Sequence, residues 1–129
     1  MELKANGKEL QVKFNFASLK LWEEKIVDAD GNKQSDDAMF DRLFTGLVQK
    51  DPRTLVNIFN GGLAHLGKDK PTYEEIFNAV SEKMGEKGVD KVAQELMAEL
   101  TANGFFKGSM KLWMDSIERQ IKGYDKFFK

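Results

Sequence analysis

The dipeptide Asn6-Gly7 constrains the fold of this chain more than any other short stretch. A type I′ turn needs positive φ at both central residues, and Asn followed by Gly is the pair most typical of it. The turn fixes which residues face each other across the two strands. The predicted pairs are Ala5 with Lys8, Leu3 with Leu10, and Met1 with Val12. Strand alternation then gathers the apolar side chains on one face and leaves Glu2, Lys4, Glu9 and Gln11 on the other.

A lone hairpin is only marginally stable in water, so its apolar face must be covered by the rest of the chain. After Phe16 the apolar residues recur at helical spacing, and segments of this kind continue to the end. We therefore expect a mainly helical α+β fold in which a hairpin packs against about five or six α-helices. The 129 residues fit a single domain, with the hairpin at 1–14 and the helical body at 16–128.

Residues that cap helices or break them predict where each helix begins and ends. The predicted N-terminal signals are Asn15, Asp36 or Asp37, Asp51 with Pro52, the capping box of Thr72 with Glu75, and Ser109. The first helix is predicted to bury a stripe of Phe16, Leu19, Leu21, Trp22 and Ile26. Glycines are expected to weaken or end the third helix at Gly61-Gly62, to bracket a turn at Gly85 and Gly88, and to close the fifth helix at Asn103-Gly104.

Composition excludes several classes of function. The absence of cysteine excludes disulfides, zinc–thiolate sites and thiol catalysis. A net charge of −1 argues against general nucleic-acid affinity. The uncharged stretch at 55–67 is shorter than the ~20 residues that a membrane-spanning helix needs. The first residues lack the layout of a secretion signal, so a cytosolic location is expected.

Motifs for metal binding or catalysis are incomplete. Asp28, Asp30 and Asn32 alternate like the start of a calcium loop, but that loop needs Gly at its sixth position and Glu at its twelfth. These positions hold Lys33 and Met39, so a plain turn is expected. His65 is the only histidine and is predicted to be structural or exposed.

Two further patterns resemble catalytic motifs but fit other roles. The adjacent carboxylates Glu23-Glu24, Asp36-Asp37 and Glu74-Glu75 diverge on a helix and do not form acid–base pairs. The segment 104–109 partly resembles a phosphate-binding loop, but such a loop needs its lysine next to a serine or threonine, and here a glycine separates them. We therefore expect no enzyme and no cofactor.

The segment from Lys107 to Lys129 carries the strongest binding signal. Six basic residues and three acidic ones are interleaved with aromatic residues. This pattern fits an amphipathic helix docked on the core, a surface for a partner protein, or more weakly a nucleic-acid surface. The candidate partner-binding residues are Trp113, Ile117, Ile121, Tyr124, Phe127 and Phe128. Phenylalanines at a chain end, which usually frays, suggest burial against the core or another molecule.

The order of these signals resembles a known family. The opening Leu3-x-x-Asn6-Gly7-Lys8-Glu9-Leu10-x-Val12-x-Phe14-x-Phe16 is similar to that of tail assembly chaperones of long-tailed phages and prophages of Gram-positive bacteria. Asp51-Pro52-x-x-Leu55-x-x-Ile58 and Lys70-Pro71-Thr72-x-Glu74-Glu75-Ile76 resemble later parts of the family pattern, which extends over roughly residues 1–121. The chain departs from it in the longer loop at 28–35 and in the aromatic C-terminus.

The resemblance implies a protein that binds the tape measure protein, keeps it soluble and helps to recruit tail tube protein. It also implies a possible homo-oligomer without catalytic residues, located in the host bacterial cytoplasm and absent from the mature virion. Two alternatives stay open. One is a structural tail-completion or head–tail connector protein, and the other is a small nucleic-acid-binding module.

Overall fold

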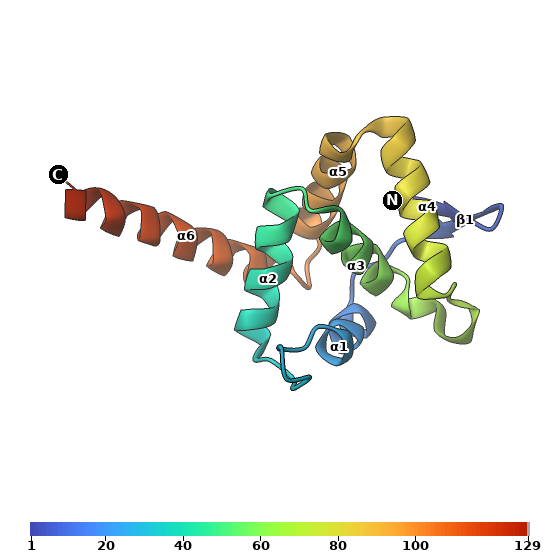
Figure 1. Ribbon diagram of the computed structural model, residues 1–129, viewed down its shortest axis with the longest axis horizontal. Helices are drawn as coiled ribbons and strands as arrows, with labels where there is room; N and C mark the ends of the chain where they lie inside the picture. Colours follow the sequence, from blue (N-terminus) through green and yellow to red (C-terminus); the bar gives the residue numbers. More distant parts are fainter. Residues whose placement is uncertain (129) are drawn as a thin grey trace.

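The computed structural model describes the backbone of residues 1–128 and the side chains of residues 1–118. Within that part, the chain forms one antiparallel hairpin, six α-helices and a short 3₁₀ helix (Figure 1). The elements are β1 (Glu2–Ala5), β2 (Lys8–Gln11), α1 (Phe16–Lys25), α2 (Asp36–Val48), α3 (Pro52–Gly62), η1 (Ala64–Asp69), α4 (Tyr73–Lys87), α5 (Val89–Ala102) and α6 (Lys107–Phe128). The predicted mainly helical α+β class is confirmed.

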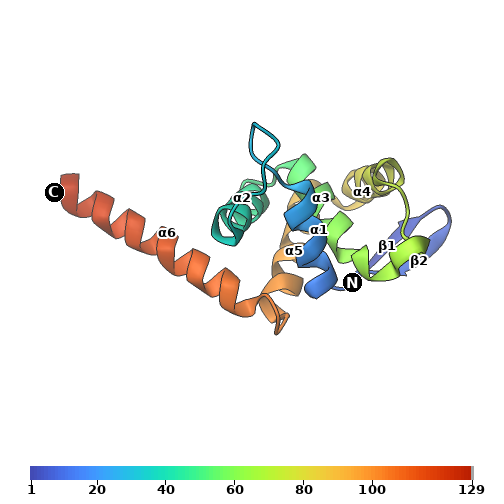
Figure 2. The ribbon, with the colours of Figure 1, turned by 90° about the horizontal axis from the view of Figure 1, so that it is seen from below.

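The hairpin has the predicted register. Leu3 pairs with Leu10, and Asn6 and Gly7 adopt φ of 54° and 77° at the turn. The Val12 N–H donates to the Met1 carbonyl oxygen at 2.9 Å, which continues the pairing by one step. Leu3 is 1% exposed, because the apolar face of the hairpin packs on α4 (Figure 2). The hairpin is therefore part of the core and not a separate appendage.

Trp22 of α1 occupies the centre of the core. Its side chain is 1% exposed, and its indole Nε1–H donates to the Asn57 carbonyl oxygen of α3 at 2.8 Å. The ring stacks on Phe14 with centroids 6.1 Å apart. It approaches α3 at Gly61, where a Cβ atom would overlap the indole. The absence of a side chain at Gly61 is what allows α1 and α3 to lie this close.

Most of the predicted helix starts are confirmed. Asn15, Asp51 and Thr72 each accept a hydrogen bond from a backbone N–H in the first turn of the helix that follows. The Thr72–Glu75 capping box forms in both directions. Asn103 caps the C-terminus of α5 as expected.

The predicted starts of two helices are wrong. Ser35 caps α2 in place of Asp36 or Asp37, because its hydroxyl accepts from the Ala38 N–H while the two aspartates occupy the first turn. The negative charges of the two aspartates there interact favourably with the positive N-terminal end of the helix dipole. Ser109 does not cap α6, which begins two residues earlier at Lys107.

Two predictions about single residues are also wrong. Gly85 lies inside α4, and only Gly88, at φ 87°, ends that helix. Phe16 is 67% exposed instead of joining the buried stripe of α1. It is the first residue of the helix, and its ring points away from the core to make an edge contact with Phe105.

Candidate protein-binding surface

The longest helix, α6, extends away from the other helices. Both views show it leaving the body beside α2, with no other element next to its C-terminal half (Figures 1 and 2). Its first turns contact α2 and α5. A helix that is docked at one end and unaccompanied at the other is a natural place for a partner to bind.

The turn between α5 and α6 is fixed by Asn103. Its side-chain oxygen accepts from the backbone N–H groups of Phe105 and Phe106, at 2.8 and 3.2 Å. Its amide nitrogen donates to the Phe14 carbonyl oxygen at 2.6 Å. One side chain therefore ties the beginning of α6 to the segment that follows the hairpin.

Aromatic rings continue this attachment across the core. Phe106 is fully buried and lies 5.4 Å, centroid to centroid, from Trp22. On its other side it meets Phe40 of α2 at 6.0 Å, and Phe40 stacks on Phe44 at 5.4 Å. Phe44 in turn makes an edge contact with Trp113 of α6 at 5.7 Å. The direction of α6 is therefore set by contacts that begin at the centre of the protein.

Trp113 is the last aromatic anchor of α6 within the described side chains. Its indole Nε1–H donates to the Asp41 carboxylate at 2.9 Å, and its ring is half-buried against α2. Met110, one turn earlier, is 1% exposed. These two residues hold α6 on the body.

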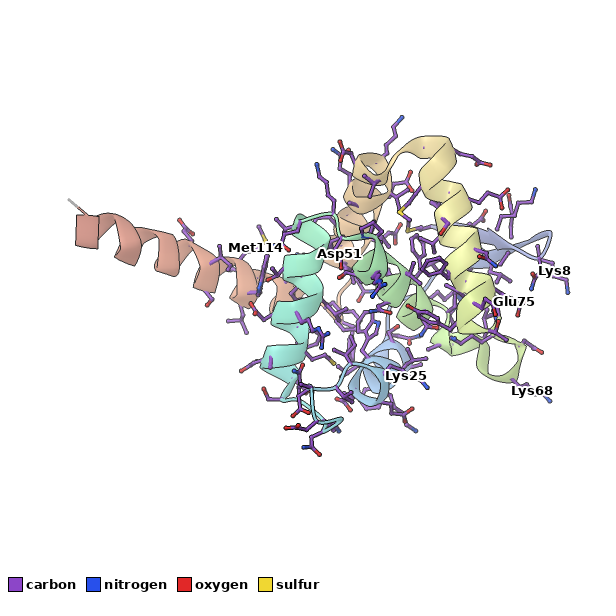
Figure 3. All side chains as sticks on the ribbon, viewed as in Figure 1. Lys8, Lys25, Asp51, Lys68, Glu75 and Met114 are labelled. Atoms are coloured by element: carbon purple, nitrogen blue, oxygen red, sulfur yellow. The ribbon has the colours of Figure 1, made fainter. Side chains whose placement is uncertain are left out.

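The apolar residues next to Trp113 are not covered. Leu112 is 69% exposed and Met114 is 53% exposed. Met114 projects from α6 close to the point where the helix leaves α2 (Figure 3). Ile117 is partly exposed one turn further on. Exposed apolar side chains that gather on one projecting element are typical of a surface that binds another protein.

The predicted partner-binding residues divide into two groups. Trp113 lies at the junction of α6 with α2, and Ile117, one turn later on α6, is partly buried. The side chains of Ile121, Tyr124, Phe127 and Phe128 lie outside the described residues, although the backbone there continues as α6.

Met114 is the residue that sequence reasoning failed to identify as a candidate. Met110 is buried in the core, whereas Met114 is more than half exposed. The signal was present in the spacing, because Met114 lies four residues after Met110 and three before Ile117. That spacing continues an apolar stripe past the point where the body ends.

A concave surface, separate from α6, lies between the hairpin, α4 and α5. This groove has a volume of about 690 Å³ and is lined chiefly by charged side chains. Glu95 pairs with Lys83 at 3.5 Å and with Lys87 at 3.1 Å, and the N-terminal ammonium pairs with Glu99 at 3.5 Å. Burial alone raises the pKa of Glu95, but the two lysines outweigh it and hold that pKa below its ordinary value. Much of the charge in the groove is thus paired within the protein.

The described residues show no arrangement suited to metal binding. Among them, no group of three or more His, Cys, Asp or Glu side chains is placed to hold an ion. The Asp28 carboxylate accepts from the backbone N–H groups of Asp30 and Asn32, which is the predicted turn. The Nε2 atom of His65 lies 2.7 Å from the Gln11 carbonyl oxygen and so ties η1 to β2. Within the described part of the chain, no helix is both long and apolar enough to cross a membrane.

Comparison with known proteins gives one clear result. A family model described as "Phage tail assembly chaperone protein, TAC" matches residues 2–113. No curated protein and no solved structure matches the chain. The matched segment includes the hairpin, all the helices through α5, and the anchored start of α6 as far as Trp113.

Proposed function

The chain belongs to the phage tail assembly chaperone family, and we propose that it binds the tape measure protein, keeps it soluble and helps to recruit tail tube subunits. Membership of the family supports a role in tail assembly through contacts with other tail proteins. The choice of the tape measure protein as partner rests on the sequence resemblance and on the form of α6. A role in binding, without catalysis, is part of the proposal.

The exposed Met114 of α6 is the observation that carries this proposal. Its side chain is 53% exposed on a helix whose base is tied to the core through Asn103, Phe106 and Trp113. Such a helix can bury the apolar stripe of a helical partner without any rearrangement of the body. We propose that the binding surface is formed by Trp113, Ile117, Ile121, Tyr124, Phe127 and Phe128, extended by Met114.

The proposal also includes where and when the protein acts. We place it in the host bacterial cytoplasm during tail assembly and outside the mature virion, since a chaperone leaves once its partner is assembled. Self-association of the chain is compatible with this role.

Co-expression with the tape measure protein tests the proposal directly. We expect most of the tape measure protein to enter the soluble fraction with this chain and to form inclusion bodies without it. A useful control is a co-expressed unrelated helical protein of similar size. The proposal is wrong if the solubility of the tape measure protein is the same with and without this chain.

Changing both Phe127 and Phe128 to serine is expected to weaken binding of the tape measure protein by about a hundredfold or more. Burying one such ring contributes about 1.5–3 kcal/mol, and the double change removes two. Pull-down of the tape measure protein, quantified against the parent chain, measures the effect. Unchanged binding and solubility would remove these two residues from the surface.

A further inference from the structure

A small pocket opens on the body where the end of α1 meets α2 and α3. It has a volume of about 250 Å³ and is lined by Lys25, Ile26, Val27, Arg42, Leu43, Thr54 and Asn57. Two of these side chains are cationic, and none is acidic. The whole lining lies within the segment that matches the family model and outside the surface proposed on α6.

The two cations of this pocket differ from those of the groove between the hairpin, α4 and α5. There, Lys83 and Lys87 both pair with Glu95. Within the described residues, neither Lys25 nor Arg42 forms an ion pair. Because no carboxylate lines the pocket either, the protein leaves this positive charge uncompensated, and an anionic group is attracted there.

Arg42 is held in place with its carboxylate-binding edge free. Its Nη1 atom donates to the Val27 carbonyl oxygen at 3.1 Å, and Val27 is itself fixed by a β-bridge to Lys33. The other edge of the guanidinium, Nε–H together with Nη2–H, can bind both oxygens of a carboxylate side by side. No contact in the described part of the chain uses that edge. Arg42 can therefore receive a carboxylate without moving.

Asn57 adds a neutral donor to the pocket. Its backbone carbonyl oxygen accepts from the Trp22 indole at 2.8 Å, and its Oδ1 atom accepts from the Tyr73 hydroxyl at 3.1 Å. With both oxygens occupied, the Nδ2–H groups are the part of this residue left to bind a ligand. Ile26 and Leu43 provide an apolar wall for the methylene groups of an acidic side chain.

The position of the pocket favours a carboxylate over a phosphate. It lies at the C-terminal end of α1, which Ile26 caps. That end of the helix dipole is negative and disfavours a doubly charged anion, whereas phosphate sites commonly use the free N–H groups of a helix N-terminus. The Ile26 N–H is already used, because it donates to the Trp22 carbonyl oxygen. A singly charged carboxylate is the better match.

Positive charge and exposed rings continue beyond the pocket. The pKa of the Lys70 ammonium is lowered from its ordinary value, first by burial and then by the charge of Lys25, so these two cations are close enough to repel each other. Tyr73, which contacts Asn57, is 47% exposed, and Phe77, one turn later on α4, is 41% exposed. This surroundings suits a longer acidic segment with apolar residues better than a single small anion.

We propose that the pocket at the end of α1 binds a carboxylate from an acidic segment of a partner protein, with Arg42 as the main contact. The segment carries Glu or Asp where it meets Arg42 and a further acidic residue toward Lys25. This site adds a second binding surface, on the body, to the one proposed on α6, and it does not depend on that proposal.

A hexaglutamate peptide with blocked ends is a suitable probe for the full chain at constant ionic strength. We expect saturable binding that shifts the NMR signals of the Asn57 side-chain amide and the Trp22 indole N–H. Arg42→Gln should weaken binding by at least about tenfold, because the paired hydrogen bonds are lost. Arg53→Gln is the matched control. It removes the same charge one turn before Asn57 but outside the lining, and should weaken binding by less than about threefold.

Further variants separate loss of the contact from loss of local structure. Arg42→Lys keeps the charge but not the paired N–H groups, and should weaken binding by at least about fivefold. Lys25→Gln leaves the hydrogen bond between Arg42 and Val27 intact and should weaken binding by about threefold or more. Lys20→Gln, on the same helix but outside the lining, should have a smaller effect. Circular dichroism and urea denaturation check that each variant is folded.

Several results would overturn this inference. The pocket is not a carboxylate site if hexaglutamate shows no saturable binding, or if Arg42→Gln and Arg53→Gln weaken it equally, which indicates attraction by general charge alone. Parent-like binding by Arg42→Lys would exclude the paired contact. Tighter binding of inorganic phosphate or oligothymidylate at the same signals would replace the acidic partner with a phosphate-bearing one. None of these measurements uses the tape measure protein, so they stand apart from the test of the proposed function.

Discussion

Replacing Gly61 with alanine is expected to destabilise the protein by about 2–3 kcal/mol, although alanine is normally the better residue in a helix. Gly61 lies in α3, and a Cβ atom there would overlap the Trp22 indole, a rigid ring that is 1% exposed and packed on all sides. To make room, the ring must shift away from Phe14 and from the Asn57 carbonyl oxygen that its Nε1–H contacts at 2.8 Å. The cost is an overpacked core together with a weakened buried hydrogen bond.

Gly85 provides the matched control for this change. It lies within α4, and a Cβ atom there meets nothing within 4 Å. Gly85→Ala should therefore show only the helix-propensity gain, a stabilisation of about 0.5–1 kcal/mol. Urea denaturation of the three chains, followed by Trp fluorescence, measures both effects. Equal shifts of the same sign for the two variants would contradict the close approach of α1 and α3.

The two glycines also show where sequence reasoning reached its limit. A glycine within a helical pattern predicts that the helix is weakened or ends there, and α3 does end at Gly62. The pattern does not reveal that Trp22, 39 positions earlier, needs the space above Gly61, because that contact is set by the packing of two separate helices. The prediction of a turn at Gly85 was wrong because it gave one glycine too much weight. The neighbouring residues have high helix propensity, and α4 continues through Gly85.

The features that sequence predicted well are local. The turn at Asn6-Gly7 fixes the hairpin register, and the capping box at Thr72 fixes the start of α4, within stretches of a few residues. Where several residues of the same capping type stand in a row, as at Ser35-Asp36-Asp37, the sequence leaves the cap uncertain by one or two positions. In the structure Ser35 is the residue with the extended backbone of an N-cap, with φ −63° and ψ 157°, and Asp36 and Asp37 are already helical.

Only part of the candidate site could be predicted from the sequence. An apolar stripe near the C-terminus is visible in the spacing, but a stripe looks the same whether the chain's own body or another molecule covers it. The structure divides it between Met110, which is buried, and Met114, which is exposed. That division depends on the Asn103 turn and on the ring contacts from Phe106 to Trp113, which bring together segments far apart in the chain.

Ending the chain at Glu118 is expected to abolish detectable binding of the tape measure protein while leaving the fold intact. The shortened chain keeps the whole segment that matches the family model, together with the Trp113 contacts to Phe44 and Asp41. It loses four residues of the proposed binding surface, Ile121, Tyr124, Phe127 and Phe128. If burial of each side chain contributes about 1.5–3 kcal/mol, the combined loss exceeds a thousandfold in affinity. The free energy of unfolding of the body should change by less than about 0.5 kcal/mol, as for surface changes that touch no core contact.

Both measurements are needed to interpret this truncation. Binding is read from pull-down and from solubility of the co-expressed tape measure protein, and stability from urea denaturation of the purified chain. If the shortened chain unfolds as the parent does and still holds the tape measure protein in solution, the binding surface must lie on the body. The groove between the hairpin, α4 and α5 would then be the place to look, and Lys83 and Lys87, which pair with Glu95 there, the residues to change first. Loss of binding without loss of stability would instead divide the molecule into a folded base and a helix that recognises the partner.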